Sequence, residues 1–145
     1  MLEKILFPTD FSEYSVKAKN ELLKLKKCNV KEIILLNVLD VRTFTYFTMM
    51  EVIEIQNFEQ EGEIVKGIQK SLDEWKAELT REGFNVKTVV REGIPFNEIL
   101  NYAEEEKVTS IILGHKGVGA VERMLLGSTA EKVMRKANVP VILIR

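Results

Sequence analysis

Short apolar runs alternate with longer segments of helical periodicity along most of the chain. The runs predict strands at residues 4–9, 33–38, 86–90, 110–113 and 140–144, because four to eight apolar or alternating residues are typical of a strand. Between them, apolar side chains recur at helical spacing. These repeats comprise Tyr14, Ala18, Leu22 and Leu25; Ile64, Ile68, Leu72, Trp75 and Leu79; Phe96, Ile99, Leu100 and Ala103; and Val133, Met134 and Ala137. The pattern predicts strands and helices in alternation.

This alternation predicts an α/β fold. Nearly continuous apolar strands indicate a parallel sheet that is covered on both faces, and right-handed crossovers place the helices there. We therefore expect a three-layer, doubly wound sheet of five parallel strands in the order 3-2-1-4-5. At 145 residues, the chain has the length of one domain, so we expect residues 1–145 to form a single domain.

Several residues mark the ends of the predicted helices. Ser12 is suited to cap the first helix, Gly83 to end the second, and Pro95 to begin the third. Residues 39–60 show no clear period and include the aromatic residues Phe44, Tyr46 and Phe47. We interpret this stretch as an insertion whose aromatics pack on the domain, with a lid or an interface patch as the alternatives.

Charge and composition narrow the class of protein. The net charge is -1 and basic residues are interleaved with acidic ones, a pattern that disfavours a nucleic-acid partner. The N-terminus lacks a signal-peptide pattern and no apolar run could span a membrane, so we expect a cytoplasmic protein without membrane contact. The single Cys28 fits a reducing compartment, and we expect it to be a small buried group at a helix end.

Glycines cluster after the fourth predicted strand with the spacing Gly-x2-Gly-x9-Gly-Ser, at Gly114, Gly117, Gly127 and Ser128. Glycines allow positive φ and let backbone N–H groups approach a ligand, and a helix that starts near Ser128 would offer further N–H groups to phosphate. Ordinary turns and a helix cap explain the same residues. Ser128 and Glu131 have the form of a capping box.

That capping box would conflict with phosphate binding. A bond from the Ser128 N–H to Glu131 would occupy a donor and bring negative charge close to the phosphate. Lys116 and Arg123 could offset this charge. The residues alone leave a phosphate site and a plain loop both open.

The glycine pattern resembles the signature of the ATP-binding branch of the universal stress protein family. The resemblance extends along the chain, through Ile5-Leu6-Phe7-Pro8-Thr9-Asp10, Leu35-Leu36-Asn37-Val38, Gly93-Ile94-Pro95 and Val139-Pro140-Val141. One position departs from the common form, because His115 and Lys116 follow the first glycine where the family often has Ser or Thr and then His or Arg.

The resemblance implies that ATP lies across the strand ends, with Mg²⁺ or Mn²⁺ carried on its phosphates. The backbone near Asp10 and Val38 would hold the adenosine, and the glycine loop and Ser128 would hold the phosphates. The candidate binding residues are Pro8, Thr9, Asp10, Val38, Gly114, His115, Lys116, Gly117, Gly127, Ser128 and Thr129. We expect no catalytic residue and no protein-bound metal, and we interpret Asp40 and Arg123 as solvated surface charges.

The resulting hypothesis is a stress-response or signalling module that binds an adenine nucleotide without efficient turnover. A slow ATP hydrolase and a stress or interaction protein that binds no nucleotide are the alternatives. A phosphoacceptor receiver would need an Asp after the third strand, where Arg91-Glu92-Gly93 stands, and a flavin carrier would be yellow. The exposed edge expected of strand 140–144, together with the resemblance, predicts a homodimer through this strand.

Overall fold

A computed structural model describes residues 1–43 and 54–145, and the side chains of all of these except 54–61. Five parallel strands form one sheet in the order β3-β2-β1-β4-β5. Their bounds are β1 (Lys4–Pro8), β2 (Glu32–Asp40), β3 (Val86–Gly93), β4 (Ser110–Gly114) and β5 (Val141–Ile144). The predicted fold class and strand order are confirmed.

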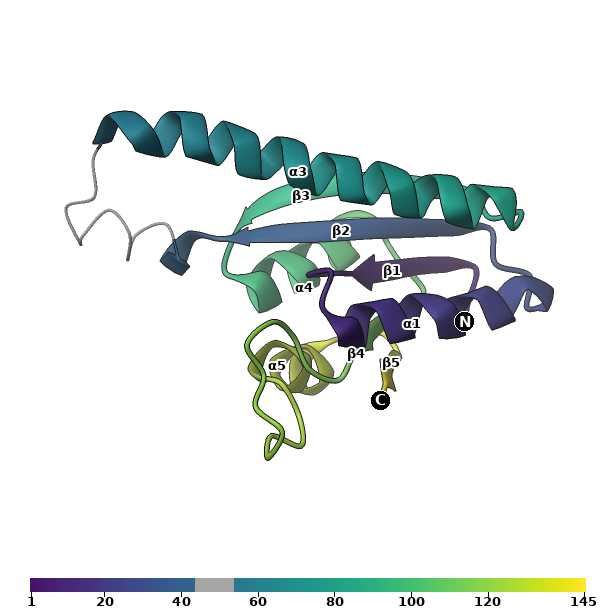
Figure 1. Cartoon of the computed structure of the whole chain (residues 1–145). Helices are drawn as coiled ribbons and strands as arrows, with labels where there is room; N and C mark the ends of the chain where they lie inside the picture. Colours follow the sequence, from purple (N-terminus) through teal and green to yellow (C-terminus); the bar gives the residue numbers. More distant parts are fainter. Residues whose placement is uncertain (44–53) are drawn as a thin grey trace.

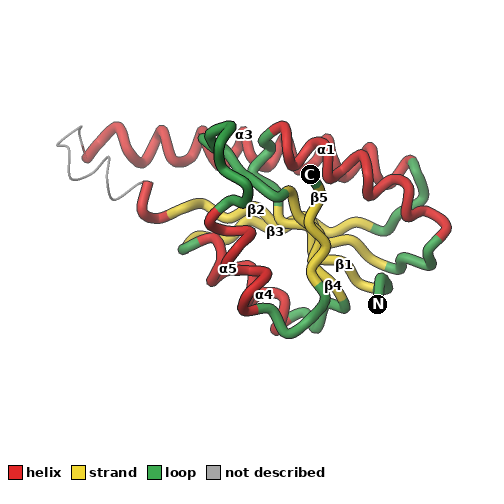
Figure 2. Tube along the Cα trace, turned by 90° about the horizontal axis from the view of Figure 1, so that it is seen from below, coloured by secondary structure: helices red, strands yellow, loops and turns green. Residues whose placement is uncertain are grey.

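The helices form two layers, one on each face of this sheet. They are α1 (Glu13–Leu23), followed by the 3-10 helix η1 (Lys24–Lys27), then α3 (Glu54–Arg81), α4 (Pro95–Glu105) and α5 (Ser128–Lys136). Figure 1 shows α1 and α3 on one face, and Figure 2 shows the strands running between these helices and the pair α4 and α5. Among the described residues, no helix is both long enough and apolar enough to cross a membrane.

Alternation along the strands builds a core on each face of the sheet. Ile33 and Leu35 of β2 belong to the cluster with α1 and α3, whereas Ile34 and Leu36 belong to the cluster with α4 and α5. Both sets are fully buried, as expected for central strands of a covered parallel sheet. Trp75 of α3 stacks on Phe7 of β1, with ring centroids 6.0 Å apart.

The predicted helix ends are confirmed at three positions. The Ser12 hydroxyl accepts a hydrogen bond from the Ser15 N–H at the start of α1. Pro95 occupies the first turn of α4. Gly83, the second residue after α3, has a φ of 97°, a left-handed conformation that glycine adopts without steric cost.

Two apolar residues of the predicted helical repeats are exposed, and the predicted burial of Cys28 is wrong. Met134 is 49 % exposed, because Ala130 and Val133 form the buried face of α5 and Met134 lies to one side of it. Ile64, in the first half of α3, is 46 % exposed. Cys28, which follows η1, is exposed to solvent.

The stretch predicted as an insertion contains ordered secondary structure at both ends. β2 continues to Asp40, and α3 begins at Glu54, ten residues before the first apolar residue of the predicted repeat. The aromatic residues Phe44, Tyr46 and Phe47 lie outside the described residues.

Candidate functional site

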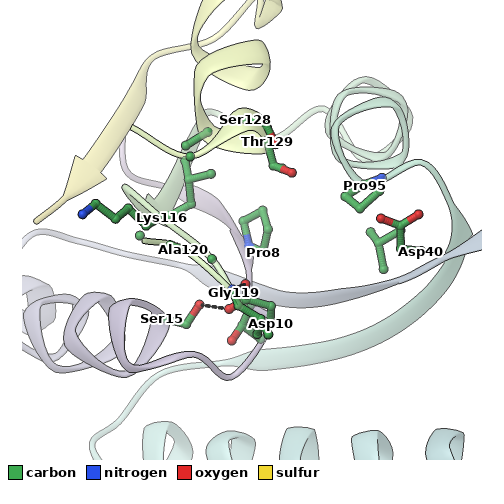
Figure 3. Close-up of a pocket in the computed structure, with 18 of the residues that line it drawn as sticks. Pro8, Asp10, Ser15, Asp40, Pro95, Lys116, Gly119, Ala120, Ser128 and Thr129 are labelled. Carbon is green, nitrogen blue, oxygen red and sulfur yellow. Dashed lines mark hydrogen bonds between the residues drawn. The ribbon is translucent and has the colours of Figure 1, made fainter. Parts of the chain in front are cut away.

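A cavity of about 460 Å³ opens at the carboxyl ends of the strands (Figure 3). It lies where β1 leads into α1 on one face and β4 leads toward α5 on the other. Connections that leave neighbouring strands in opposite directions create such a crevice, which is the usual ligand site of open α/β sheets. The volume is within the range of small-molecule sites.

The cavity brings together all the predicted site residues except His115. Those that line it are Pro8, Thr9, Asp10, Val38, Gly114, Lys116, Gly117, Gly127, Ser128 and Thr129. Other lining residues were not predicted, and they include Ser15, Leu36, Asp40, Arg42, Pro95, Ile99 and Met124. Apolar side chains from β1, β2 and α4 therefore face the glycine-containing loop and the start of α5 across one cavity.

Asp10 anchors the glycine loop, which comprises residues 115–127. Its Oδ2 accepts a hydrogen bond from the Val118 N–H at 2.9 Å, while its Oδ1 accepts from the Ser12 N–H and from the Ser15 hydroxyl, both at 3.0 Å. Ser15 is only 4 % exposed, so its hydroxyl is held firmly against the carboxylate. The carboxylate thus links the start of α1 to a loop more than a hundred residues away, as Figure 3 shows for Ser15 and Asp10.

The signature glycines make close contacts within the protein itself. A Cβ on Gly117 would lie 2.5 Å from Asp10 Oδ2, and one on Gly127 would lie 3.1 Å from the Lys116 Cα. A Cβ on Gly114 would lie 3.0 Å from the Tyr14 backbone. None of these three glycines has a positive φ; within the loop that conformation belongs to Gly119, at 76°. The expectation of positive φ at the signature glycines is therefore wrong.

The start of α5 is open toward the cavity. Gly127 is the N-cap residue and provides no side-chain cap, and Glu131 pairs with Arg135 on the following turn. The predicted capping box is therefore wrong, and the conflict it posed for phosphate binding disappears. The N–H groups of Ser128 and Thr129 form no hydrogen bond within the described part of the chain, so they are donors available to a ligand.

His115 and Lys116 both contact Tyr14, the lysine through its ammonium 5.7 Å from the ring centre, and only Lys116 belongs to the cavity lining. His115 lies outside the cavity lining: its ring contacts Tyr14 edge-on, and its Nδ1 lies 3.2 Å from the Ile144 carbonyl oxygen. The His115 carbonyl accepts the Gly127 N–H at 2.7 Å. Lys116 lines the cavity and forms no ion pair within the described residues.

Asp40, interpreted from the sequence as a surface charge, lines the cavity at the end of β2. Arg42 forms a two-pronged ion pair with it, with the Nη2 to Oδ2 distance at 2.7 Å and the Nε to Oδ1 distance at 2.9 Å. The hydrogen bonds from Arg42 hold the pKa of Asp40 below its ordinary value. Arg123 is exposed, as predicted.

Asn37 supports the site from the buried side of β2. Its side-chain amide donates to the Thr9 carbonyl at 2.9 Å, and this contact fixes the end of β1 directly before Asp10. Sequence reasoning missed both Asn37 and Ser15. The signal for Asn37 was a single amide inside the apolar run Ile33 to Val38, and the signal for Ser15 was a hydroxyl three residues after a helix cap.

Comparison with known proteins gives a consistent result over the whole chain. Residues 1–145 match the family model described as the universal stress protein family. The chain is 34 % identical to the universal stress protein MJ0577 of Methanocaldococcus jannaschii, with 100 % of this chain and 96 % of that protein covered. The solved structure of MJ0577 superposes with a TM-score of 0.89 at 35 % identity, covering 99 % of this chain and 96 % of that one.

Two more distant solved structures contain nucleotides. A universal stress protein from Archaeoglobus fulgidus in complex with dAMP has a TM-score of 0.67 at 19 % identity, and all of both chains is covered. A universal stress protein in complex with cAMP has a TM-score of 0.64 at 16 % identity, with 99 % of this chain and 97 % of that one covered. At these identities the likeness concerns the fold.

Proposed function

This chain belongs to the universal stress protein family, and from that premise we propose that its cavity binds an adenine nucleotide, with ATP as the expected ligand. One observation carries the proposal: a single cavity joins an apolar wall to unpaired N–H groups at a helix start. A nucleotide has the matching parts, namely a flat base and an anionic phosphate.

The residues present fit such a ligand. Pro8, Val38, Pro95 and Ile99 form an apolar wall suited to a base. Ser128 and Thr129 lie on the other side of the cavity in Figure 3 and offer N–H groups, whereas the Lys116 ammonium points away from the cavity, toward Tyr14 and the Glu122 carbonyl. We therefore assign the base to the side with β2 and α4, and the phosphates to the side with the glycine loop and α5.

The relatives support this choice of ligand class. Two proteins with the same fold bind dAMP and cAMP, and both ligands contain adenine and one phosphate. For this chain we propose that the nucleotide stabilises one conformation of the glycine loop in a stress-response or signalling module, without efficient turnover. A ligand shifts such an equilibrium through its different affinity for the two conformations. Mg²⁺ or Mn²⁺ would accompany a polyphosphate.

We also propose that the protein acts in the cytoplasm as a homodimer. β5 is an edge strand of four apolar residues, Val141–Ile144. Pairing through β4 leaves the other side of this strand open within the described residues, and open edges favour pairing with a second strand. A two-fold axis beside β5 would join the two sheets into one.

The proposed ligand is tested on protein purified without added nucleotide and on protein stripped of bound molecules. Mass spectrometry of the extract should find an adenine nucleotide retained intact. In thermal denaturation, ATP should raise the midpoint, because a ligand that binds only the native state adds about 2.7 kcal/mol of stability at 100 times its Kd. GTP should raise it less. Equal shifts with ATP and GTP would reject adenine recognition, and no shift with either would reject a nucleotide site.

A further inference from the structure

We infer that Phe11 and Trp75 are positioning residues of the ligand site: packed behind the cavity, they hold Asp10 in the direction that keeps the glycine loop in place. Neither of the two lines the cavity. Both pack against the core cluster of α1 and α3, whereas the cavity residues Leu36 and Ile99 belong to the cluster of α4 and α5. This inference rests on the proposed function and specifies which residues outside the cavity determine its affinity for a nucleotide.

Phe11 has a backbone conformation that bulky residues rarely adopt. Its φ of 60° lies in the left-handed region, where a large side chain is strained and persists only if its surroundings hold it. Residues 9–12 connect β1 to α1, and Phe11 supplies the positive φ of this turn. The turn places Asp10 against the glycine loop, where its carboxylate accepts a hydrogen bond from the Val118 N–H at 2.9 Å.

Two contacts hold Phe11 in this conformation. Its N–H donates to the Thr9 hydroxyl at 3.0 Å, and its ring meets the Trp75 indole edge-on, with ring centroids 5.1 Å apart. Edge-to-face packing is a favoured geometry of aromatic pairs. Thr9 is fixed to β2, because its N–H donates to the Leu36 carbonyl and its own carbonyl accepts the Asn37 amide. The Thr9 contact lies within the turn, so Trp75 supplies the support from outside it.

Trp75 is a firm support because it contacts two other elements besides Phe11. Its indole stacks on Phe7 of β1, with centroids 6.0 Å apart, and the Lys19 ammonium of α1 lies 4.7 Å from the centre of its ring. The same ammonium pairs with Glu78 of α3, which keeps it beside the indole. A ring held in this way fixes the position of Phe11, whereas a flexible side chain would yield.

These contacts form one chain from α3 to the glycine loop. Trp75 supports Phe11, which fixes the backbone beside Asp10. The Asp10 carboxylate then holds the loop through the Val118 N–H. Loss of the Trp75 ring removes the support of a strained residue, so the turn relaxes and Asp10 releases the loop. Because residues 116–120 of this loop line the cavity, nucleotide binding weakens although no residue of the lining has changed.

Calorimetric titration of three α3 variants with Mg²⁺-ATP tests the inference. Trp75→Leu should weaken binding by about tenfold, equivalent to about 1.4 kcal/mol, whereas Trp75→Phe retains an aromatic ring and should keep most of the affinity. Leu79→Ala is the matched control, because Leu79 is fully buried in the same core cluster near the end of α3 that leads to the start of β3. Its loss lowers stability without touching the turn, so the variant should bind within about twofold of the parent.

Hydrogen exchange at the Val118 amide reports on the loop directly and needs no ligand. Trp75→Leu should speed this exchange by about threefold or more, whereas Leu79→Ala should leave it unchanged, because an exposed loop amide exchanges by local opening. Phe11→Gly should behave as Trp75→Leu does, since glycine accepts the positive φ but removes the ring.

The outcomes separate this inference from the proposed function. Trp75→Leu or Phe11→Gly with the parent's affinity, or with the parent's exchange rate at Val118, overturns the inference alone, and so does an equal loss of affinity in Leu79→Ala. Failure of the parent to bind Mg²⁺-ATP rejects the proposed function. Exchange at Val118 in the variants then still decides whether the two aromatic residues hold the loop.

Discussion

Gly127 lies where the chain at the start of α5 crosses the glycine loop at close range. Its N–H donates to the His115 carbonyl at 2.7 Å, and a side chain would meet the Lys116 Cα at 3.1 Å and the His115 carbonyl oxygen at 3.3 Å. Both neighbours are backbone atoms, which cannot move aside as a flexible side chain can. Two sections of the loop therefore stay together only if this residue has no Cβ.

We predict that Gly127→Ala destabilises the protein by about 1–3 kcal/mol, as overpacking of a tight contact does, and also weakens nucleotide binding. Gly67→Ala is the matched control, because Gly67 lies in α3 with open space around it. That change should stabilise the protein by about 0.5–1 kcal/mol, since alanine favours the helix. Chemical denaturation measures the free energy of unfolding of both variants. A Gly127→Ala protein as stable as the parent would contradict the tight packing of Gly127 against the loop backbone.

A second prediction at the scale of residues concerns the Asp10 carboxylate. Asp10→Ala removes the acceptor of the Val118 N–H, so hydrogen exchange at the Val118 amide should become about tenfold faster or more, because hydrogen bonds to charged groups contribute about 1.5–3 kcal/mol. Asp73→Ala is the control, because Asp73 lies on the exposed face of α3 and accepts a hydrogen bond from Gln69 on the same helix. Unchanged exchange at Val118 in Asp10→Ala would show that the anchor does not hold the loop.

Individual site residues could be predicted where a motif marks them and not where packing decides. The glycine spacing and Asp10 predicted a site at the strand ends, and these residues line a cavity there. The direction of His115 could not be predicted, because it depends on the contact with Tyr14 and the end of β5. The role of Asp40 was also hidden, since nothing in the sequence shows how far β2 extends.

At the scale of elements, the end of α4 is tied to two strands by Glu106. The Lys4 ammonium of β1 lies 3.1 Å from its Oε2, and the Lys87 ammonium of β3 lies 3.4 Å from its Oε1. The hydrogen bond from Lys4, with help from Lys87, lowers the pKa of Glu106 below its ordinary value of 4.5. The carboxylate therefore favours the folded state only while it is ionised.

This lowered pKa predicts a loss of stability in acid. Stability from Glu106 is fully present above pH 4.5, its ordinary value, and is lost as the pH falls toward the lower folded pKa. Glu106→Gln should therefore lower the free energy of unfolding at neutral pH and flatten its decline below pH 4.5. Glu63→Gln, on the exposed surface of α3, is the control. If the free energy of unfolding declines below pH 4.5 in the same way for Glu106→Gln and the parent, the ion pair with Lys4 does not have this role.

The sequence predicted which strands and helices form better than it predicted where they begin and end. Every predicted strand is present, because apolar runs bounded by Gly, Pro or polar residues survive in the folded sheet. The extra residues of β2 and α3 lack a clear apolar period, so the sequence pattern did not predict them. Likewise, Ser128 is the first residue of α5, whereas the capping box would have made it the cap.

At the scale of the whole molecule, the edge strand predicts how two copies assemble. The hydrogen bonds from Ile111 to the Pro140 carbonyl and from His115 to the Ile144 carbonyl place alternate residues of β5 toward β4. The N–H of Leu143 therefore points outward, and Leu143→Pro removes it from the open edge. Light scattering should show a dimer for the parent and a monomer for a folded Leu143→Pro protein. A monomeric parent at micromolar concentration would refute the dimer.

The order of the sheet was the most predictable property of the molecule, because alternation of strands and helices leaves few topologies once crossovers are right-handed. That order places β1 beside β4 and so fixes where a ligand cavity opens. Which molecule enters the cavity depends on side-chain directions that only the folded structure defines.

The most direct test of the central claim is a titration of the ¹⁵N-labelled protein with AMP and with Mg²⁺-ATP, followed through its backbone amide signals. We predict saturable shifts at Ser128 and Thr129, whose N–H groups are unpaired at the start of α5, and at Val118, whose N–H binds Asp10 in the cavity lining. We expect little change along the outer face of α3. Saturable shifts confined to α3, or no saturable shift with either nucleotide, would contradict the assignment of this cavity as the nucleotide site.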